Sequence, residues 1–269
     1  MYGAKICNLP GLPVLKKQET VKTVRRRYGL LRILLTFTAN GLARYIKKNR
    51  SMLDILYKDH QLIALNKPPG IAAQPDKTGD PTFLEQAEAY CKQPLHVVHR
   101  LDRPASGLIL YAKTKTAMTA LTEQLRSRTV EKTYLVVVQQ APPEPEGTLV
   151  HFLRKNEAKN ISVAETKESP GTERAELHYR LAGSSDRYHL LEIQLISGRH
   201  HQIRVQLAAI GCPIKGDVKY GFRRSNRDRS IHLHAWRLAF DHPVSGERIR
   251  LEAGLPGEDP VWAALQTTF

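Results

Sequence analysis

The stretch His99-Arg100-Leu101-Asp102-Arg103-Pro104-Ala105-Ser106-Gly107-Leu108 is the part of the chain around which the rest is organised. It places one carboxylate, Asp102, between two arginines and ahead of a Pro/Ser/Gly turn, with apolar strand-like residues on both sides. Loops held by a rigid scaffold commonly present functional side chains. We expect the flanking arginines to keep Asp102 ionised, because a nearby positive charge favours the carboxylate. The local pattern alone favours a plainer interpretation, a surface turn with a structural ion pair.

The positive charge of the chain is large and unevenly distributed. The formal net charge is +15 over 269 residues, yet residues 1–51 hold 12 Lys/Arg and one acidic residue, a net of +11. Such an excess suggests a polyanionic partner, most simply nucleic acid. Because most of the excess lies in residues 1–51, a nucleic-acid site elsewhere in the chain must depend on local clusters of basic residues.

The first 51 residues read as a basic extension rather than as a domain, because their apolar residues are too few to form a core. Three explanations stay open: a transit peptide, a flexible RNA-binding arm, or an upstream segment that is not translated, with the protein beginning at Met52. We therefore divide the chain into an extension at 1–51, expected to be disordered or not native, and a single folded domain at 52–269.

The pattern from Met52 onward predicts strands with interspersed helices. Apolar and β-branched runs predict strands at 53–57, 62–65, 132–138, 177–181, 191–195, 232–241 and 249–251. Helices are predicted at 82–91, 114–127, 203–210 and 260–265. Thr82 and Glu85 form a capping box for the first of them. Because strands dominate without a regular βαβ rhythm, we predict an α+β fold on a largely antiparallel, mixed β-sheet with flanking helices and loops.

Cysteine and histidine spacing argues against several classes of protein. The three cysteines, Cys7, Cys91 and Cys212, form no C-x-x-C pair, so we expect a reducing compartment and a cytoplasmic location. No apolar run approaches the ~18 residues of a membrane span. The pair at 200–201 lacks H-x-x-x-H or H-E-x-x-H spacing, so we expect no metal site.

Five blocks of the sequence, in this order, resemble the RluA-type family of RNA pseudouridine synthases. They are NKPPG at 66–70, HRLDRPASGL at 99–108, EKTY at 131–134, GRHHQIRVQL at 198–207, and the stretch from His234 through Pro243. The similarity runs from about Met52 to about Leu255. The HRLD block alone is moderately specific, but all five blocks in order outweigh the plainer interpretation of Asp102.

The resemblance implies the pseudouridine synthase fold and a cofactor-free isomerase. Such an enzyme detaches a uracil from its ribose in RNA, rotates it, and rejoins it through C5. Asp102 matches the essential carboxylate, acting as nucleophile or as base. Tyr134 matches the tyrosine that packs on the target base and assists removal of the proton from C5. Arg204 matches the arginine that pairs with that carboxylate. Arg100 matches the residue that takes the place of the flipped nucleotide, and Ile203 an apolar residue of the pocket.

Other residues of the matched blocks are expected to contact the substrate, namely His99, Arg199 and Lys67. Two positions depart from the family pattern. His200 replaces a small hydroxyl residue and Gln206 replaces a histidine, which puts substrate fit in doubt more than activity.

The expected partner is a structured tRNA or ribosomal RNA, bound by a monomer. A base stacked in RNA must be flipped out before an enzyme can act on it, which demands an apolar platform and positive groups. The arginines at 223–229 fit RNA contact and a solvated loop about equally. Two other functions are considered: a non-catalytic RNA-binding protein or RNA chaperone on the same scaffold, and a metal-dependent nucleic-acid hydrolase.

Overall fold

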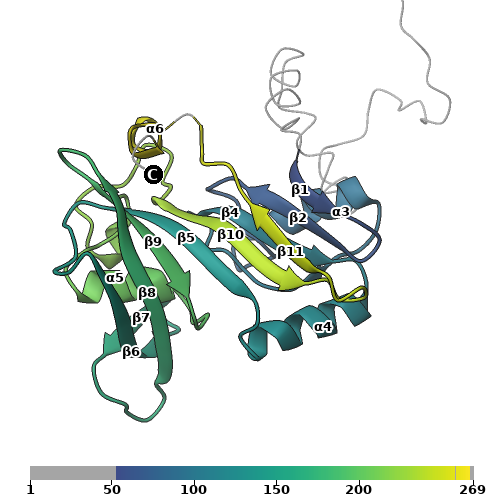
Figure 1. Cartoon of the computed structure of the whole chain (residues 1–269), viewed down its shortest axis with the longest axis horizontal. Coiled ribbons are helices and arrows are strands. Elements are labelled where there is room, and N and C mark those ends of the chain that lie inside the picture. The colour runs from purple at the N-terminus through teal and green to yellow at the C-terminus, as the bar shows by residue number, and fades with distance from the viewer. Residues whose placement is uncertain (1–52, 258, 267–269) are drawn as a thin grey trace, which may run out of the picture. The chain divides into compact units, whose positions relative to one another are not determined.

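The computed structural model describes residues 53–257 and 259–266, so the predicted basic extension at 1–51 lies outside the described residues. Figure 1 shows strands as the main element of the described part, with short helices beside them. The strands are β1 (Asp54–Lys58), β2 (Leu62–Lys67), β3 (His96–Val97), β4 (Ser106–Ala112), β5 (Glu131–Val138), β6 (Glu146–Asn156), β7 (Ile161–Glu165), β8 (Glu173–Ser184), β9 (His189–Leu195), β10 (Leu233–Asp241) and β11 (Arg248–Glu252). The helices are α3 (Phe83–Cys91), α4 (Lys115–Arg126), α5 (Gln202–Ala209), the 3-10 turn η2 (Val218–Tyr220) and α6 (Pro260–Gln266).

The described strands form one eleven-stranded sheet in the order β1-β2-β4-β10-β5-β9-β8-β6-β7, with β11 beside β10 and β3 beside β4. The pairings between these strands are antiparallel, except that β4 and β10 run parallel. The predicted α+β fold on a largely antiparallel, mixed sheet is therefore confirmed.

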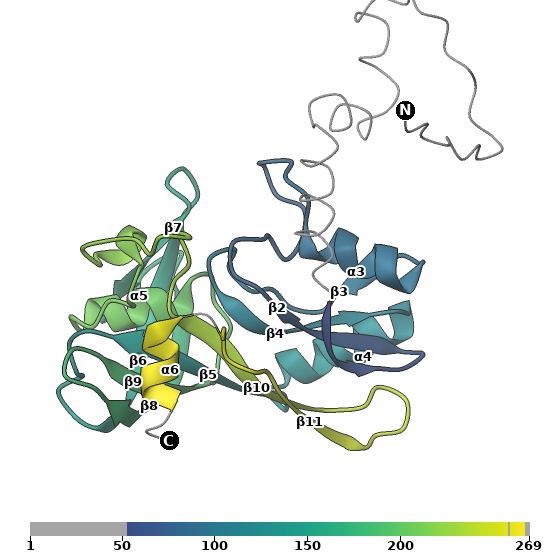
Figure 2. The same ribbon diagram turned by 90° about the horizontal axis from the view of Figure 1, so that it is seen from above.

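Strand β10 holds the two ends of this sheet together. One of its edges pairs with β5, while the other is shared between β4 near its start and β11 near its end. Only two residue pairs, His234 with Ser106 and Ala235 with Gly107, join β4 to β10. Figure 2 shows β5 and β10 running between the group around β2, β4 and α4 and the group around β6 to β9.

Local sequence signals explain where the helices begin. Thr82 caps α3 through its side chain, and Glu85 returns the bond, so the predicted capping box is confirmed. Thr114 caps α4 by accepting from the Ala117 N–H. Within the described residues, every helix falls short of the length and apolar character of a membrane-spanning helix.

Candidate active site

Asp102 lies in a tight turn between β3 and β4. The Ala105 N–H donates to the Asp102 carbonyl at 3.1 Å and closes the turn. The Pro104 carbonyl accepts from the Ile231 N–H, also at 3.1 Å, just before β10 begins. Because its backbone groups are bonded to a neighbouring segment, the turn can hold the Asp102 carboxylate in one direction.

Lys67 supports the same turn from inside the protein. Its side chain is fully buried, and Nζ donates to the carbonyls of Pro68 (2.9 Å), Ile71 (3.1 Å) and Ala105 (2.7 Å). Burial lowers the pKa of Lys67 to about 7, although the charge of Asp102 opposes that shift. The expected contact between Lys67 and substrate is wrong, because the side chain has no exposed surface and does not line the pocket.

The arginine after Asp102 does not pair with it. Arg103 directs its guanidinium to Asp80 (2.6 Å) and Asp76 (2.9 Å) in the loop between β2 and α3. The expectation that both flanking arginines keep Asp102 ionised is therefore wrong for Arg103. The cation that contacts the carboxylate comes instead from α5.

Arg204 bridges two carboxylates at the start of α5. Its Nη1 donates to Asp102 Oδ2 at 2.8 Å, while Nε and Nη2 donate to the two oxygens of Asp217 at 2.7 and 2.9 Å. The side chains of Arg204 and Asp217 are 5% and 1% exposed, whereas that of Asp102 is 27% exposed. The side-on pair with Asp217 uses Nε and Nη2, which leaves the N–H groups of Nη1 for Asp102.

Sequence reasoning did not find Asp217. The residue lies in a loop and belongs to none of the five matched blocks. The number of hydrogen-bond donors on Arg204 could have pointed to it. A guanidinium has five N–H groups, more than the carboxylate of Asp102 can accept, so a second acidic partner is expected when the arginine is buried.

The charge state of Asp102 follows from two opposed effects. Burial raises the pKa of the Asp102 carboxyl, but the charge of Arg204, its hydrogen bond and the neighbouring imidazoles of His201 and His200 together lower it by more. The net shift is below the ordinary value, so Asp102 is ionised at neutral pH. An ionised carboxylate in a partly closed pocket is a group able to act as nucleophile or base.

His201 faces Asp102 as a neutral ring with a defined proton position. Burial lowers the pKa of His201 to about 3, against the opposing charge of Asp102. Tyr220 Oη accepts from the Ser162 N–H at 2.8 Å and lies 2.8 Å from His201 Nδ1. We assign the hydroxyl proton to the Nδ1 contact, which puts the ring proton on Nε2, the nitrogen 3.7 Å from the Asp102 Oδ2 carboxylate oxygen.

The two departures from the family pattern occupy different places. His200 lines the pocket, stacks on His201 with ring centroids 3.8 Å apart, and contacts Ser162 Oγ at 2.9 Å. Gln206 is fully buried and donates to the Leu149 carbonyl at 3.1 Å. Gln206 therefore cannot contact a substrate. The expectation that it changes substrate fit is wrong as far as direct contact is concerned.

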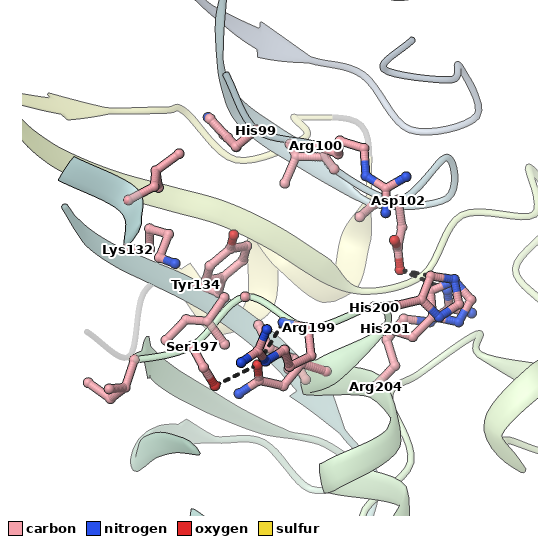
Figure 3. Close-up of a pocket in the computed structure, with 18 of the residues that line it drawn as sticks. His99, Arg100, Asp102, Lys132, Tyr134, Ser197, Arg199, His200, His201 and Arg204 are labelled. Atoms are coloured by element: carbon pink, nitrogen blue, oxygen red, sulfur yellow. Dashed lines mark hydrogen bonds and ion pairs between the residues drawn. The ribbon is translucent and has the colours of Figure 1, made fainter. Parts of the chain in front are cut away.

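A pocket of about 610 Å³ lies between the Asp102 turn, β5 and the start of α5 (Figure 3). Seven of the eight predicted site residues line it, namely His99, Arg100, Asp102, Tyr134, Arg199, Ile203 and Arg204. This volume falls within the usual range of small-ligand pockets, roughly 300–1,000 Å³. Figure 3 shows the Asp102 carboxylate directed toward His201 and Arg204, across the pocket from Tyr134.

Tyr134 forms part of the pocket wall from β5. Its side chain is buried apart from the surface that it gives to the pocket. Burial raises the pKa of Tyr134, and the negative charge of Asp102 raises it further. The phenol is therefore protonated at neutral pH and offers an O–H donor beside an aromatic face.

Two of the predicted substrate contacts are already engaged within the protein. His99 Nε2 accepts from the Leu110 N–H at 3.1 Å, and burial lowers the pKa of His99 to about 4, which keeps the ring neutral. Arg199 pairs with Glu173 at 2.7 Å at the rim of the pocket. Arg100 is exposed, and its side chain has no hydrogen-bond partner within the part of the chain that the structure describes.

Among the residues that the structure describes, no group of three His, Cys, Asp or Glu side chains could hold a metal ion.

A sequence profile of the RNA pseudouridylate synthase family matches residues 61–209, a span that contains the Asp102 turn, β5 and α5. The chain belongs to this family of RNA pseudouridine synthases. The assignment confirms the resemblance to RluA-type enzymes. Pseudouridine synthases convert uridine in RNA to pseudouridine, so this synthase is an isomerase that acts on RNA.

Individual relatives agree with the assignment. The synthase is 34% identical over 216 residues to the uncharacterised RNA pseudouridine synthase YhcT of Bacillus subtilis, covering 77% of this chain and 70% of the relative. It is 32% identical to a ribosomal large subunit pseudouridine synthase C of Rickettsia bellii, covering 75% and 68%. The solved structure of human RNA pseudouridylate synthase domain containing 4 matches with a TM-score of 0.61 at 25% identity, covering 81% of this chain and 92% of the human one.

Proposed function

We propose that this synthase isomerises a uridine in a structured tRNA or ribosomal RNA, with Asp102 acting on the glycosidic bond of a flipped nucleotide. The observation that carries the proposal is the ionised Asp102, held by Arg204 at 2.8 Å in a pocket that also contains Tyr134. A flipped base needs an aromatic or apolar seat, and Tyr134 with Ile203 supplies one.

In the reaction the N1–C1′ bond of the uridine breaks, the uracil turns, and a C5–C1′ bond forms. Asp102 either attacks as a nucleophile or removes a proton, and both roles require the ionised form that Arg204 maintains. The proton on C5 is lost and N1 ends protonated, so atoms and charge balance without an oxidant or reductant.

Tyr134 has a narrower role in this proposal than the family resemblance alone allows. Because burial raises the pKa of Tyr134, the resting phenol is protonated and cannot accept the C5 proton. We assign it to stacking on the uracil and to donating a hydrogen bond from its hydroxyl.

The class of RNA is supported by the names of relatives. A tRNA pseudouridine synthase C of Pectobacterium carotovorum is 32% identical over 240 residues, and the Rickettsia relative named above acts on the ribosomal large subunit. Both classes of RNA are structured, and both are consistent with base flipping. We also propose that the synthase works in the cytoplasm, because its described cysteines, Cys91 and Cys212, are free thiols suited to a reducing compartment. We propose in addition that it acts as a monomer.

The test is complementation of a deletion strain, with pseudouridines in total tRNA and ribosomal RNA mapped by carbodiimide probing. The full-length wild type should restore at least one pseudouridine that the deletion removes, and Asp102→Asn should not. Asp80→Asn serves as the matched control, since Asp80 is exposed and pairs with Arg103 outside the pocket. Full restoration by Asp102→Asn would overturn the assigned chemistry, and no lost pseudouridine in the deletion would favour a non-catalytic RNA-binding role.

A further inference from the structure

The cations that line the pocket differ in whether they already have anionic partners. Three are paired with carboxylates, namely Arg126 with Glu123, Arg199 with Glu173, and Arg204 with Asp102 and Asp217. Three others, Arg100, Arg128 and Lys132, have no hydrogen bond or ion pair from their side chains to any described residue. Arg100 already has an expected role in replacing the flipped nucleotide, so Arg128 and Lys132 are the unexplained pair.

Lys132 lies at the end of the pocket away from Asp102. It precedes Tyr134 by two residues on β5, so both side chains lie on one face, about 7 Å apart along the strand. In the view of Figure 3, Tyr134 lies between Lys132 and Asp102. A Cβ added to Gly198 would lie 3.6 Å from Lys132 Nζ, which places the ammonium against the loop before α5.

Arg128 brings a second positive charge to Lys132. It follows the last residues of α4 in the left-handed conformation, with φ of 62°, and its exposed side chain lines the same pocket. Burial lowers the pKa of Lys132, and the charge of Arg128 lowers it further. The negative end of the α4 dipole would explain a cation at Arg128, but it would not explain the half-buried, unpaired Lys132.

We propose that Arg128 and Lys132 form a phosphate subsite that holds a backbone phosphate of the RNA next to the flipped uridine. The inference rests on the proposed function, because it takes Tyr134 as the seat of the base. A phosphodiester anion would relieve the repulsion between the two cations and accept hydrogen bonds from both. A carbonyl of uracil is neutral and would leave both charges uncompensated, so the phosphate is the better partner.

Titration of the full-length protein with uridine and with uridine 3′,5′-bisphosphate tests the subsite without turnover. Wild type should bind the bisphosphate at least about tenfold more tightly than uridine, the value of one charge-assisted hydrogen bond. Arg128→Gln and Lys132→Gln, singly and together, should reduce that preference while leaving uridine affinity unchanged. Lys132→Arg should retain most of it.

Lys115→Gln is the matched control, because it removes one positive charge from the exposed start of α4 without touching the pocket. An unchanged preference in the double variant would overturn the subsite, as would weaker binding of uridine itself, which would make Lys132 a reader of the base. The result is separable from the proposed function. Activity in Asp102→Asn would sink the assigned chemistry, whereas the phosphate preference would be unaffected. Because Arg128 is exposed, its single variant keeps the test valid if the double variant does not fold.

Discussion

At the scale of single residues, Arg204 contributes most to keeping Asp102 ionised. Arg204 holds the pKa of Asp102 below its ordinary value of about 3.9, so stability from that contact is complete above this pH and is lost as pH falls through the lowered pKa. Without Arg204 the effect of burial remains, and the pKa should rise above the ordinary value.

We therefore predict that Arg204→Gln shifts the acid limb of the isomerisation rate to higher pH. The measurement is the single-turnover rate at saturating RNA across pH 4 to 8, where the wild-type rate should show no loss from this group above about pH 5. Arg103→Gln is the control, because Arg103 adjoins Asp102 in sequence but pairs with Asp76 and Asp80. An acid limb at the same pH in Arg204→Gln and wild type would contradict the prediction.

The proton position on His201 gives a second prediction at this scale. Tyr220→Phe removes the hydroxyl that donates to His201 Nδ1, so the ring is free to present its unprotonated nitrogen to Asp102. We expect the single-turnover rate to fall by up to about tenfold, with RNA affinity unchanged. Nitrogen NMR of the imidazole should show a mixture of tautomers. An unchanged rate together with an unchanged tautomer would refute the role assigned to Tyr220.

At the scale of elements, the narrow joint between β4 and β10 is the most sensitive point of the sheet. Gly107 has φ of +109°, and a Cβ there would lie 2.3 Å from the Ala235 carbonyl oxygen. We predict that Gly107→Ala lowers the free energy of unfolding by at least about 3 kcal/mol, measured by urea denaturation. Gly79→Ala is the control, with φ of +69° and no atom near its Cβ. It should cost only about 1 kcal/mol, and equal losses in the two variants would contradict the argument.

The sequence predicted individual helices and strands better than it predicted which strands pair with each other. The capping box of Thr82 and Glu85 is local chemistry, so it marks the start of α3 without knowledge of the fold. The parallel pairing of β4 with β10 could not be predicted, because alternation shows which face of a strand is buried and not which strand lies beside it.

The same distinction holds for the site: sequence motifs predicted some of its residues, whereas contacts between distant parts of the chain were not predicted. The matched blocks predicted that Asp102, Tyr134 and Arg204 lie in one site, and all three line the pocket. They misplaced Lys67, because a matched motif does not tell whether a side chain faces the substrate or the interior. They missed Asp217, whose pairing with Arg204 is a tertiary contact between α5 and the loop after it.

At the scale of the whole molecule, the described residues contain both the sheet and the pocket. We predict that a chain starting at Met52 folds and isomerises uridine, with a melting temperature within a few degrees of the full-length value. Its affinity for RNA should depend less on salt, because residues 1–51 carry +11 of the net charge. Thermal melting and single-turnover assays of both chains check this, and loss of soluble, folded protein from the shorter chain would contradict it.

The narrow joint between β4 and β10 also determines when during folding the protein becomes active. Ser106 and His234 are 128 residues apart in sequence, and Asp102 and Arg204 are 102 apart. Contacts of such separation form slowly, because loop closure costs entropy before the contacts stabilise the chain. Hairpins such as β8–β9 need only neighbouring residues. A refolding chain should therefore gain strand structure before it gains activity. The rate at which isomerisation activity returns then measures the rate at which β4 pairs with β10.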